Sequence, residues 1–439
     1  MIIVISDFDL SGSGYMNIAV SLCNELHTRH GFDVTALGIA YDMTEHNWPF
    51  SIIPVNQAGM LREIPSMIHN FRAMGESGAW KPLEAIIVML DIPLHEKLLQ
   101  IDRGSGENLI PYLGLFPIES GPLCASWAST LAIMNERLVI SEFGARMVED
   151  AGLESTYLPV GIDTESWRPP TAEERKALRD SLGFTDDDFV ILTVADNQER
   201  KNLSAAMSIV AETRKHINAK WMLVTRMESP VGWKLPDLAN SFEMTDHFIA
   251  FNRGLPFDRL WILYAAADAF LLTSKAEGLC LPILEAMATE TPVVAHNMTA
   301  IPEHIYADPD WSRVENGVWG KGKPKGARGL VFPADYTIID PWGNSVRSFP
   351  NQREAVKRLV QLSKMSPAKI DAMVKAGREY AIGRTWSKAG EVMATSLRNS
   401  LGEIAELKLK AAQTALPASA PRPIAPMYGL PDTGGIEDD

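Results

Sequence analysis

Short apolar runs alternate with amphipathic helical patterns over the first 160 residues. The chain opens with an apolar run at 2–6, a glycine-rich turn and a helical pattern over about 15–30. Runs of this length are typical of parallel strands that are buried on both faces of a sheet. The others in this part of the chain lie at 34–37, 85–90, 110–115 and 137–140. The pattern predicts a doubly wound α/β domain.

A second α/β series follows, with apolar runs at 188–195, 220–225, 247–251, 269–273 and 292–295. A chain of 439 residues exceeds the roughly 250 to 300 residues that one core spans, so we expect two domains. We place the first domain at 1–170 and the second at 171–385. The last helical pattern, at 386–412, is long enough to run back across the first domain.

Two segments fall outside these patterns. Residues 307–332 are rich in Gly, Lys, Trp and Pro without a clear period, which predicts a long surface loop. Residues 413–439 are rich in Pro and Ala and end in acidic residues, so they cannot bury a core and are expected to be disordered.

Composition and charge narrow the class of protein. A formal net charge of -14 argues against binding the nucleic-acid backbone, because no broad positive field offsets phosphate repulsion. The three cysteines lack metal-ligand spacing, and we expect no metal site. The start of the chain lacks signal-peptide features and no apolar run is long enough to span a membrane, which predicts a cytoplasmic protein. His95 is expected to be structural or solvated.

The segment EGLCLPILEA at 277–286 carries two carboxylates, Glu277 and Glu285, eight positions apart around a turn. Pro282 suits a first helical position, so a helix should begin there. The backbone N–H groups just before it, at Leu279, Cys280 and Leu281, are then candidates to bind an anion at the helix N-terminus, with that of Ile283 beside them. Both carboxylates can accept hydrogen bonds from hydroxyl groups in one pocket. Alternatively, Glu285 only favours the helix dipole and Glu277 is solvated.

Two strand-to-helix turns add to this motif. Gly12 and Gly14 lie in the first, where small residues let the backbone approach a phosphate, although such glycines often serve turn geometry alone. Arg200 and Lys201 lie in the corresponding turn of the second series. They can neutralise a diphosphate, or they are simply a solvated pair of cations.

Together these segments resemble the retaining glycosyltransferases of family 4, whose GT-B fold is α/β with two Rossmann-like domains facing across a cleft. The resemblance covers roughly 1–401 and includes PIESGPL at 117–123, YLPVGIDTESWRP at 157–169 and IPEHI at 301–305. It implies that Glu285 binds the donor ribose, Glu277 the donor sugar, and Arg200 with Lys201 the diphosphate. The phosphate cradle is then completed by the backbone of Leu279, Cys280 and Leu281, with Gly12 and Gly14 across the cleft.

The sequence departs from that family in three places. Asp196 stands where an arginine is frequent, and Cys280 replaces a frequent glycine. The usual acceptor-side histidine is absent, and Glu119 is our candidate to replace it in catalysis. The resemblance also implies base contacts near Asn252 and Arg253.

The implied reaction transfers a hexose from a nucleoside-diphosphate sugar to an acceptor hydroxyl, with retention and without a metal or other cofactor. A nucleotide-sugar epimerase of the same fold and a catalytically silent nucleotide- or sugar-binding protein are the alternatives. The donor base, the sugar and the acceptor, which is a glycan, a lipid or a protein, are left open by the sequence.

Overall fold

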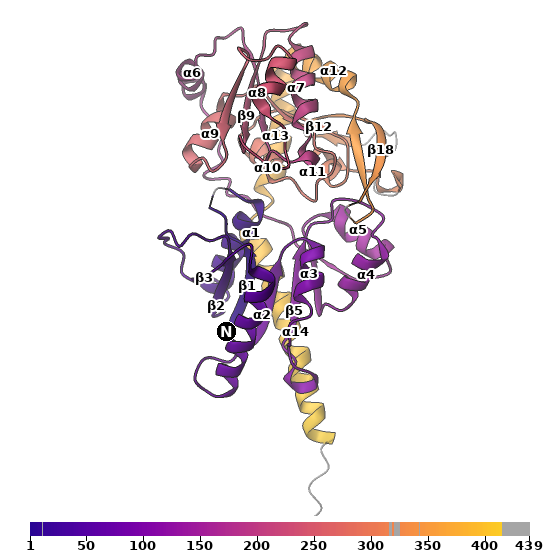
Figure 1. The fold of residues 1–439 in the computed structure, drawn as a ribbon. Coiled ribbons are helices and arrows are strands. Elements are labelled where there is room, and N and C mark those ends of the chain that lie inside the picture. The colour runs from indigo at the N-terminus through magenta and orange to yellow at the C-terminus, as the bar shows by residue number, and fades with distance from the viewer. Residues whose placement is uncertain (11, 316–317, 320–324, 342, 415–439) are drawn as a thin grey trace, which may run out of the picture.

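The computed structural model describes residues 1–10, 12–315, 318–319, 325–341 and 343–414. Two α/β domains lie one above the other, as Figure 1 shows. The first contains a seven-stranded parallel sheet in the order β3-β2-β1-β4-β5-β6-β7. Its strands are β1 Ile2–Asp7, β2 Val34–Ile39, β3 Ser51–Val55, β4 Ala85–Met89, β5 Tyr112–Phe116, β6 Glu136–Val139 and β7 Thr156–Tyr157. The predicted doubly wound α/β fold is confirmed for this half.

Helices cover both faces of the first sheet because its strands are apolar on both sides. Ile3 and Ile5 of β1 pack in one core cluster with residues of α2, α3 and α5, whereas Ile2 and Val4 pack in a second cluster with α1 and the last helix, α14. The helices of this domain are α1 Gly14–Thr28, α2 Met60–Glu76, α3 Ile92–Leu98, α4 Ala125–Ala132 and α5 Glu142–Asp150, with a short 3₁₀ turn η1 at Gly106–Asn108.

The second domain repeats this architecture around a six-stranded parallel sheet in the order β10-β9-β8-β11-β12-β17. Its strands are β8 Phe189–Val194, β9 Ala219–Thr225, β10 Phe248–Asn252, β11 Ala269–Leu272, β12 Val293–His296 and β17 Leu330–Phe332. Its helices are α6 Ala172–Ser181, α7 Leu203–Thr213, α8 Leu235–Ser241, α9 Phe257–Ala266, α10 Leu281–Ala288, α11 Ile301–Ile305, α12 Gln352–Ser363 and α13 Pro367–Ile382, with the 3₁₀ turns η2 Glu199–Lys201 and η3 Trp311–Arg313.

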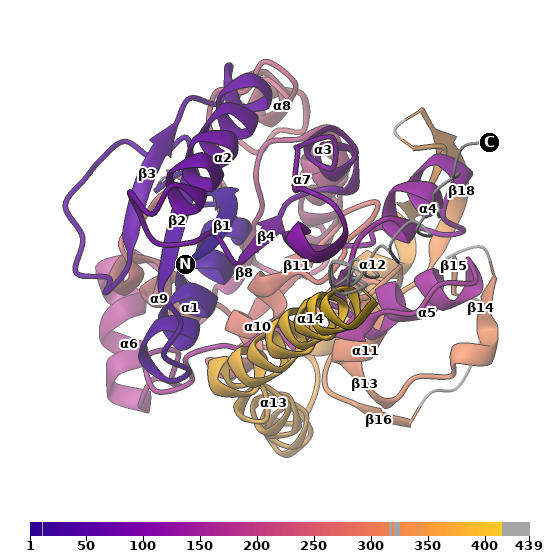
Figure 2. The same ribbon diagram turned by 90° about the horizontal axis from the view of Figure 1, so that it is seen from below.

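Helix α14 Trp386–Thr414 leaves the second domain and packs beside α1 of the first. Figure 2 shows α14 on the same side of the first sheet as α1. Met393 and Leu397 enter the same core cluster as Leu22 of α1. The two connections between the domains touch where they cross, because the Ile162 N–H donates to the Arg384 carbonyl at 3.0 Å.

The segment expected to be a plain surface loop, 307–332, contains short strands instead, so that expectation is wrong for its described part. The antiparallel pairs are β13 Tyr306–Asp308 with β16 Lys325–Ala327 and β14 Val314–Glu315 with β15 Val318–Trp319. Residues 316–317 and 320–324 lie outside the described residues.

A hairpin of β18 Ala334–Asp340 and β19 Ser345–Pro350 follows, and the apolar pattern did not predict it. Residues 413–414 of the expected tail belong to α14, and 415–439 lie outside the described residues. Within the part of the chain that the structure describes, no helix combines the length and apolar character needed to cross a membrane.

Candidate active site

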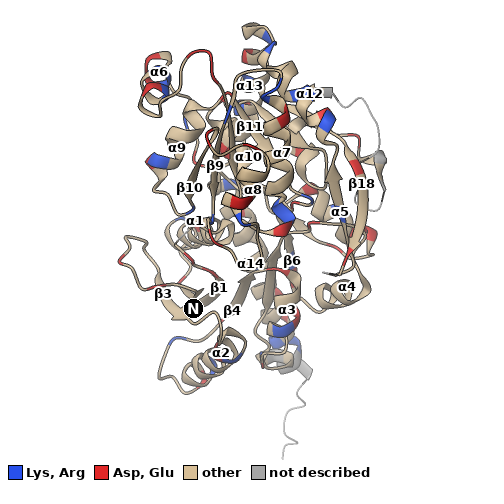
Figure 3. Cartoon of the chain, turned by 45° about the horizontal axis from the view of Figure 1, so that its top comes forward, with Lys and Arg blue, Asp and Glu red and all other residues tan. Residues whose placement is uncertain are grey.

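The predicted residues meet where the carboxyl ends of the two sheets approach each other. In an open parallel sheet, ligands bind beside the strands at which the strand order reverses. These are β1 and β4 in the first sheet and β8 and β11 in the second. Gly12 and Gly14 follow β1, Arg200 and Lys201 follow β8, and Glu277 follows β11. Charged segments of both signs occur at this junction, as Figure 3 shows.

Glu277 is buried, with a side chain that is 5% exposed, and cations surround it. Its carboxylate accepts hydrogen bonds from Lys201 Nζ at 2.6 Å, Arg200 Nη1 at 3.2 Å and Ser274 Oγ at 2.6 Å. Burial alone raises the pKa of this carboxyl, but Lys201 and Arg200 outweigh burial and lower the pKa to about 2. Glu277 is therefore ionised at neutral pH.

Arg200 links the two domains. Its Nη2 lies 3.0 Å from Oε1 of Glu119, which belongs to the first domain, and its Nη1 also donates to the Ala276 carbonyl at 2.6 Å. Burial lowers the pKa of this guanidinium, yet Glu119 and Glu277 raise it overall, so Arg200 stays charged. Burial raises the pKa of Glu119, and Arg200 opposes that effect. The structure thus brings together all four predicted catalytic residues, Glu119, Arg200, Lys201 and Glu277.

Helix α10 begins at Leu281, one residue before the predicted start, so Pro282 occupies the second helical position. Cys280 is the N-cap and has a left-handed backbone, with φ 78°. The N–H of Ile283 donates to the Cys280 carbonyl at 3.1 Å, which makes it a poor candidate for anion binding. The N–H groups of Leu279, Cys280 and Leu281 donate to no described residue, so these three remain candidates.

The first domain closes over this turn. A Cβ atom placed on Gly278 would lie 2.4 Å from Pro117 Cβ, and one on Gly14 would lie 3.9 Å from Leu281 Cδ1. Gly14 therefore faces the start of α10 across the domain boundary. The glycine at 278 is required by close packing, because any side chain would push the two domains apart.

His304 contacts the turn that precedes α10 through its ring nitrogens. Its Nε2 lies 2.7 Å from the Leu279 carbonyl and its Nδ1 lies 3.1 Å from the Tyr380 hydroxyl. Burial lowers the pKa of His304 to about 3, so the ring is neutral. A carbonyl can only accept, so the proton resides on Nε2 and Tyr380 donates to Nδ1. The IPEHI segment thus fixes the carbonyl of Leu279.

Glu285 is buried on α10 and accepts a hydrogen bond from the Tyr264 hydroxyl at 2.7 Å. Burial raises its pKa to about 7, although the Tyr264 hydrogen bond lowers it in part. The two carboxylates of the motif therefore do not share one environment. Glu277 is held by cations, whereas Glu285 is held by a neutral hydroxyl.

A second set of ionic contacts crosses the domains at Arg253, after β10. Its Nη2 lies 2.6 Å from Oδ2 of Asp9 in the first domain, and its Nη1 lies 3.4 Å from Oδ2 of Asp196. Asp196 also lies 3.4 Å from Nε of Arg226. Asp196, which stands where the family frequently has an arginine, is thus the ion-pair partner of two arginines. Gly12 lies against Gly254 in the same region, since a Cβ on Gly12 would lie 3.6 Å from the Gly254 nitrogen.

Asn252 is the last residue of β10 and its side chain is exposed. The predicted contact of Asn252 and Arg253 with a base stays a prediction.

Three residues of the cluster were not predicted. The Tyr15 hydroxyl donates to Asp91 at 2.5 Å, and these residues follow β1 and β4 at the reversal of strand order. Asp91 follows the apolar run at 85–90 directly, which is a usable signal in the sequence. Arg347 of β19 lies 3.5 Å from Glu119, and no motif marked it because the hairpin that carries it was not predicted.

His95 is structural. Its side chain is fully buried, with Nδ1 2.9 Å from the Tyr112 hydroxyl and Nε2 3.0 Å from the Leu90 carbonyl. Burial lowers its pKa to about 4, so the ring is neutral. Among the described residues, no group of three His, Cys, Asp or Glu side chains is arranged to hold a metal ion.

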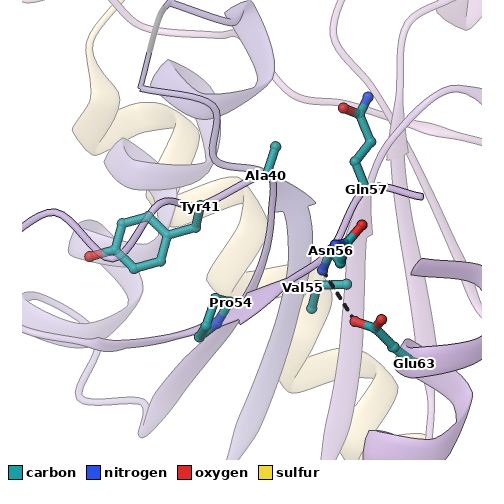
Figure 4. A pocket seen from close by; sticks show the side chains of 7 residues that line it. All are labelled: Ala40, Tyr41, Pro54, Val55, Asn56, Gln57 and Glu63. Carbon is teal, nitrogen blue, oxygen red and sulfur yellow. Dashed lines mark hydrogen bonds between the residues drawn. The ribbon is translucent and has the colours of Figure 1, made fainter. Parts of the chain in front are cut away.

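A hollow of about 450 Å³ lies elsewhere, at the carboxyl ends of β2 and β3. In Figure 4 the Tyr41 side chain points away from Asn56 and Glu63, and the Asn56 N–H donates to Glu63 at 3.1 Å. None of the predicted site residues lines it. Its lining consists of Ala40, Tyr41, Pro54, Val55, Asn56, Gln57 and Glu63.

Comparison with known proteins defines the class of fold first. The chain superimposes on sucrose-phosphate synthase from Thermosynechococcus elongatus with a TM-score of 0.63 at 16% identity, covering 94% of this chain and 99% of that one. Two facing Rossmann-like domains with a crossover helix are the GT-B fold of glycosyltransferases.

The second domain carries the similarity in sequence. Residues 174–323 match the family model described as glycosyl transferases group 1. The match contains Arg200, Lys201, Glu277 and Glu285.

Two relatives show similarity over part of their length. Alpha-monoglucosyldiacylglycerol synthase of Streptococcus pneumoniae is 30% identical over 146 residues, which span 33% of this chain and 33% of that protein. A GDP-mannose-dependent alpha-(1-6)-phosphatidylinositol monomannoside mannosyltransferase of Mycolicibacterium smegmatis is 28% identical over 177 residues, which span 38% of this chain and 44% of that protein. The similarity thus covers less than half of each relative.

Proposed function

We propose that this protein is a retaining glycosyltransferase that moves a sugar from a nucleoside-diphosphate sugar to an acceptor hydroxyl. The observation that carries the proposal is the contact of Arg200 and Lys201 with Glu277, together with the three N–H groups of residues 279–281 at the start of α10. Cations and helix-terminal N–H groups bind phosphate, and an ionised carboxylate binds sugar hydroxyls.

Stabilisation of the leaving group supplies most of the rate in this proposal. The diphosphate replaces Glu119 as the ion-pair partner of Arg200. It also accepts hydrogen bonds from the N–H groups of Leu279, Cys280 and Leu281, and Lys201 lies beside it. These groups are in place before charge develops on the leaving oxygen, so little reorganisation is needed in the transition state. A metal ion and a bound cofactor are not part of the mechanism.

The carboxylates orient the donor. Glu277 is ionised and accepts hydrogen bonds from sugar hydroxyls, and Glu285 accepts them from the ribose. The bond from the anomeric carbon to the leaving phosphate oxygen breaks, and the acceptor oxygen bonds to the same face of that carbon. The acceptor proton passes to a phosphate oxygen, so configuration is retained and the atoms balance. Closure of the domains excludes water that would hydrolyse the donor.

The acceptor is a lipid-linked or free saccharide in this proposal. The two relatives named above carry diacylglycerol and phosphatidylinositol in their names, which supports a glycolipid as the first acceptor to assay. The proposed setting is the cytoplasm, where nucleotide sugars are available.

A silent binding protein is the second candidate, and one observation favours it. Asp196 holds Arg253 and Arg226 where the family frequently has an arginine for the phosphates. Turnover distinguishes the candidates, since a transferase releases nucleoside diphosphate from a nucleotide sugar in the presence of acceptors, and a silent binder releases none. An epimerase would instead convert the sugar without releasing the nucleotide.

Binding of UDP, GDP and ADP by titration calorimetry tests the site. We expect Lys201→Ala to weaken binding of the preferred nucleotide by roughly tenfold to hundredfold, because a charge-assisted hydrogen bond to phosphate is lost. Lys357→Ala is the matched control, because Lys357 is an exposed lysine on α12 that pairs with Glu354. Equal affinity of the two variants would mean that Lys201 does not touch the nucleotide.

A further inference from the structure

The hairpin of β18 and β19 reaches from the second domain to the first. The Val346 N–H donates to Ser120 Oγ at 2.6 Å, and a Cβ on Gly343 would lie 2.2 Å from the ring of Trp127 in α4. Figure 2 shows β18 beside α4. The hairpin therefore presents β19 to the loop that carries Glu119.

Three buried side chains of β19, those of Ser345, Arg347 and Ser348, have a polar atom without a hydrogen-bond partner among the described residues. Arg347 is 5% exposed and Ser345 is 3% exposed. Among the described residues, neither Nη1 of Arg347 nor Oγ of Ser345 has a hydrogen-bond partner. The two residues alternate along the strand and share one of its faces. Buried polar groups are usually paired, so the unpaired atoms of Ser345 and Arg347 on one face make that face a candidate for binding a polar group.

Glu119 lies between Arg347 and the proposed diphosphate site. Its Oε2 is 3.5 Å from Arg347 Nη1 and its Oε1 is 3.0 Å from Arg200 Nη2. The side chains of Glu119 and Arg200 are 23% and 21% exposed, so this point is partly open to solvent. The distance to Arg347 is an ion-pair distance without a hydrogen bond. On its other side, Nε of Arg347 lies 4.0 Å from Oδ2 of Asp340, at the end of β18.

We propose that Arg347 binds an acidic group, a carboxylate or a phosphate, on a sugar substrate of this protein. A guanidinium presents paired N–H groups that match the two oxygens of such an anion. The hydroxyl of Ser345 completes the site. In the ligand-free protein the Glu119 carboxylate stands beside Arg347 in place of that group. The inference rests on the proposed function and adds the class of sugar, which belongs to the donor or to the acceptor.

Matched sugar pairs test the inference and identify the source of the acidic group. The donor arm compares UDP-glucuronate with UDP-glucose by calorimetry. The acceptor arm compares transfer to glucuronate-terminated and glucose-terminated oligosaccharides, and to glucose 6-phosphate and glucose. We expect the acidic member to be favoured by at least about tenfold in one arm, and Arg347→Gln to remove that preference.

Two further variants separate a binding role from a structural one. Arg347→Lys keeps the charge in the hairpin but loses the paired N–H groups, so it should keep the fold and lose part of the preference. Arg353→Gln removes an exposed arginine of α12 and should change nothing. If UDP binds but neither arm shows a preference in the native protein, the inference is overturned and the proposed function stands. If no nucleotide binds, both fall.

Discussion

Glu277 and Glu285 belong to one motif, yet their surroundings give them opposite ionisation behaviour. Two cations lower the pKa of Glu277 to about 2, whereas burial raises that of Glu285 to about 7. At neutral pH Glu277 is therefore ionised, whereas Glu285 is present in both its protonated and its ionised form. Environment rather than residue type assigns the two roles, as it does for pairs of carboxylates in other enzymes.

The raised pKa of Glu285 predicts a dependence of stability on pH. The pKa of Glu285 is raised from 4.5 to about 7, so the folded protein binds more protons than the unfolded chain between those values. The stability due to this group is complete below pH 4.5 and is lost as the pH rises through about 7. We expect native protein to lose on the order of 2 to 3 kcal/mol relative to Glu285→Gln between pH 5 and 8. Urea unfolding of both proteins at the two pH values measures the difference.

Glu277→Gln is the control for that prediction. Its folded pKa of about 2 and its ordinary value of 4.5 both lie below pH 5, so its effect on stability should hardly change between pH 5 and 8. The difference in free energy of unfolding between native protein and Glu285→Gln should therefore change between pH 5 and 8. If it stays constant, Glu285 is not protonated in the folded protein at pH 5.

At the scale of elements, the start of α10 depends on an unusual backbone at Cys280. A residue with a side chain in the left-handed region costs roughly 1 to 2 kcal/mol, and glycine avoids this cost. We expect Cys280→Gly to be more stable than Cys280→Ala by about 1 kcal/mol, because both lose the sulfur and only glycine relieves the strain. Unfolding by urea compares the two variants directly. A more stable alanine variant would show that the φ of 78° at Cys280 carries no strain.

The elements that sequence patterns predicted well are those whose burial is continuous along the chain. The apolar runs at 85–90 and 269–273 became β4 and β11, because a strand covered on both faces is apolar at every position. The β18–β19 hairpin escaped prediction because its strands are stabilised by each other and by docking on Trp127. Tyr336 and Ile339 of β18 are exposed, so its apolar residues do not mark a buried face.

At the scale of the whole molecule, Gly278 sets how closely the domains approach. A Cβ at this position would lie 2.4 Å from Pro117 Cβ and 3.2 Å from Pro117 Cα. We expect Gly278→Ala to disfavour the closed arrangement by about 1 to 3 kcal/mol, because overpacking forces the two loops apart. The radius of gyration from small-angle X-ray scattering should increase, and nucleotide affinity should fall.

Gly402→Ala is the matched control, because a Cβ at Gly402 on α14 meets nothing within 4 Å. This variant should bind nucleotide normally and keep the native radius of gyration. If Gly278→Ala also keeps both properties, the contact with Pro117 does not control closure.

The alternation of buried strands and helices in the two main sheets follows from the chain alone, and so do the candidate residues of the site. Apolar periodicity marks buried strands locally, and the residues at 277–285 and 200–201 carry their charges and turn geometry within a few positions. Contacts between distant segments required the folded molecule. Glu119 meets Arg200 and Arg347, and Asp9 meets Arg253, only because two sheets bring their carboxyl ends together. Such pairs leave no local pattern, and the ionisation states of Glu277 and Glu285 depend on them and on burial.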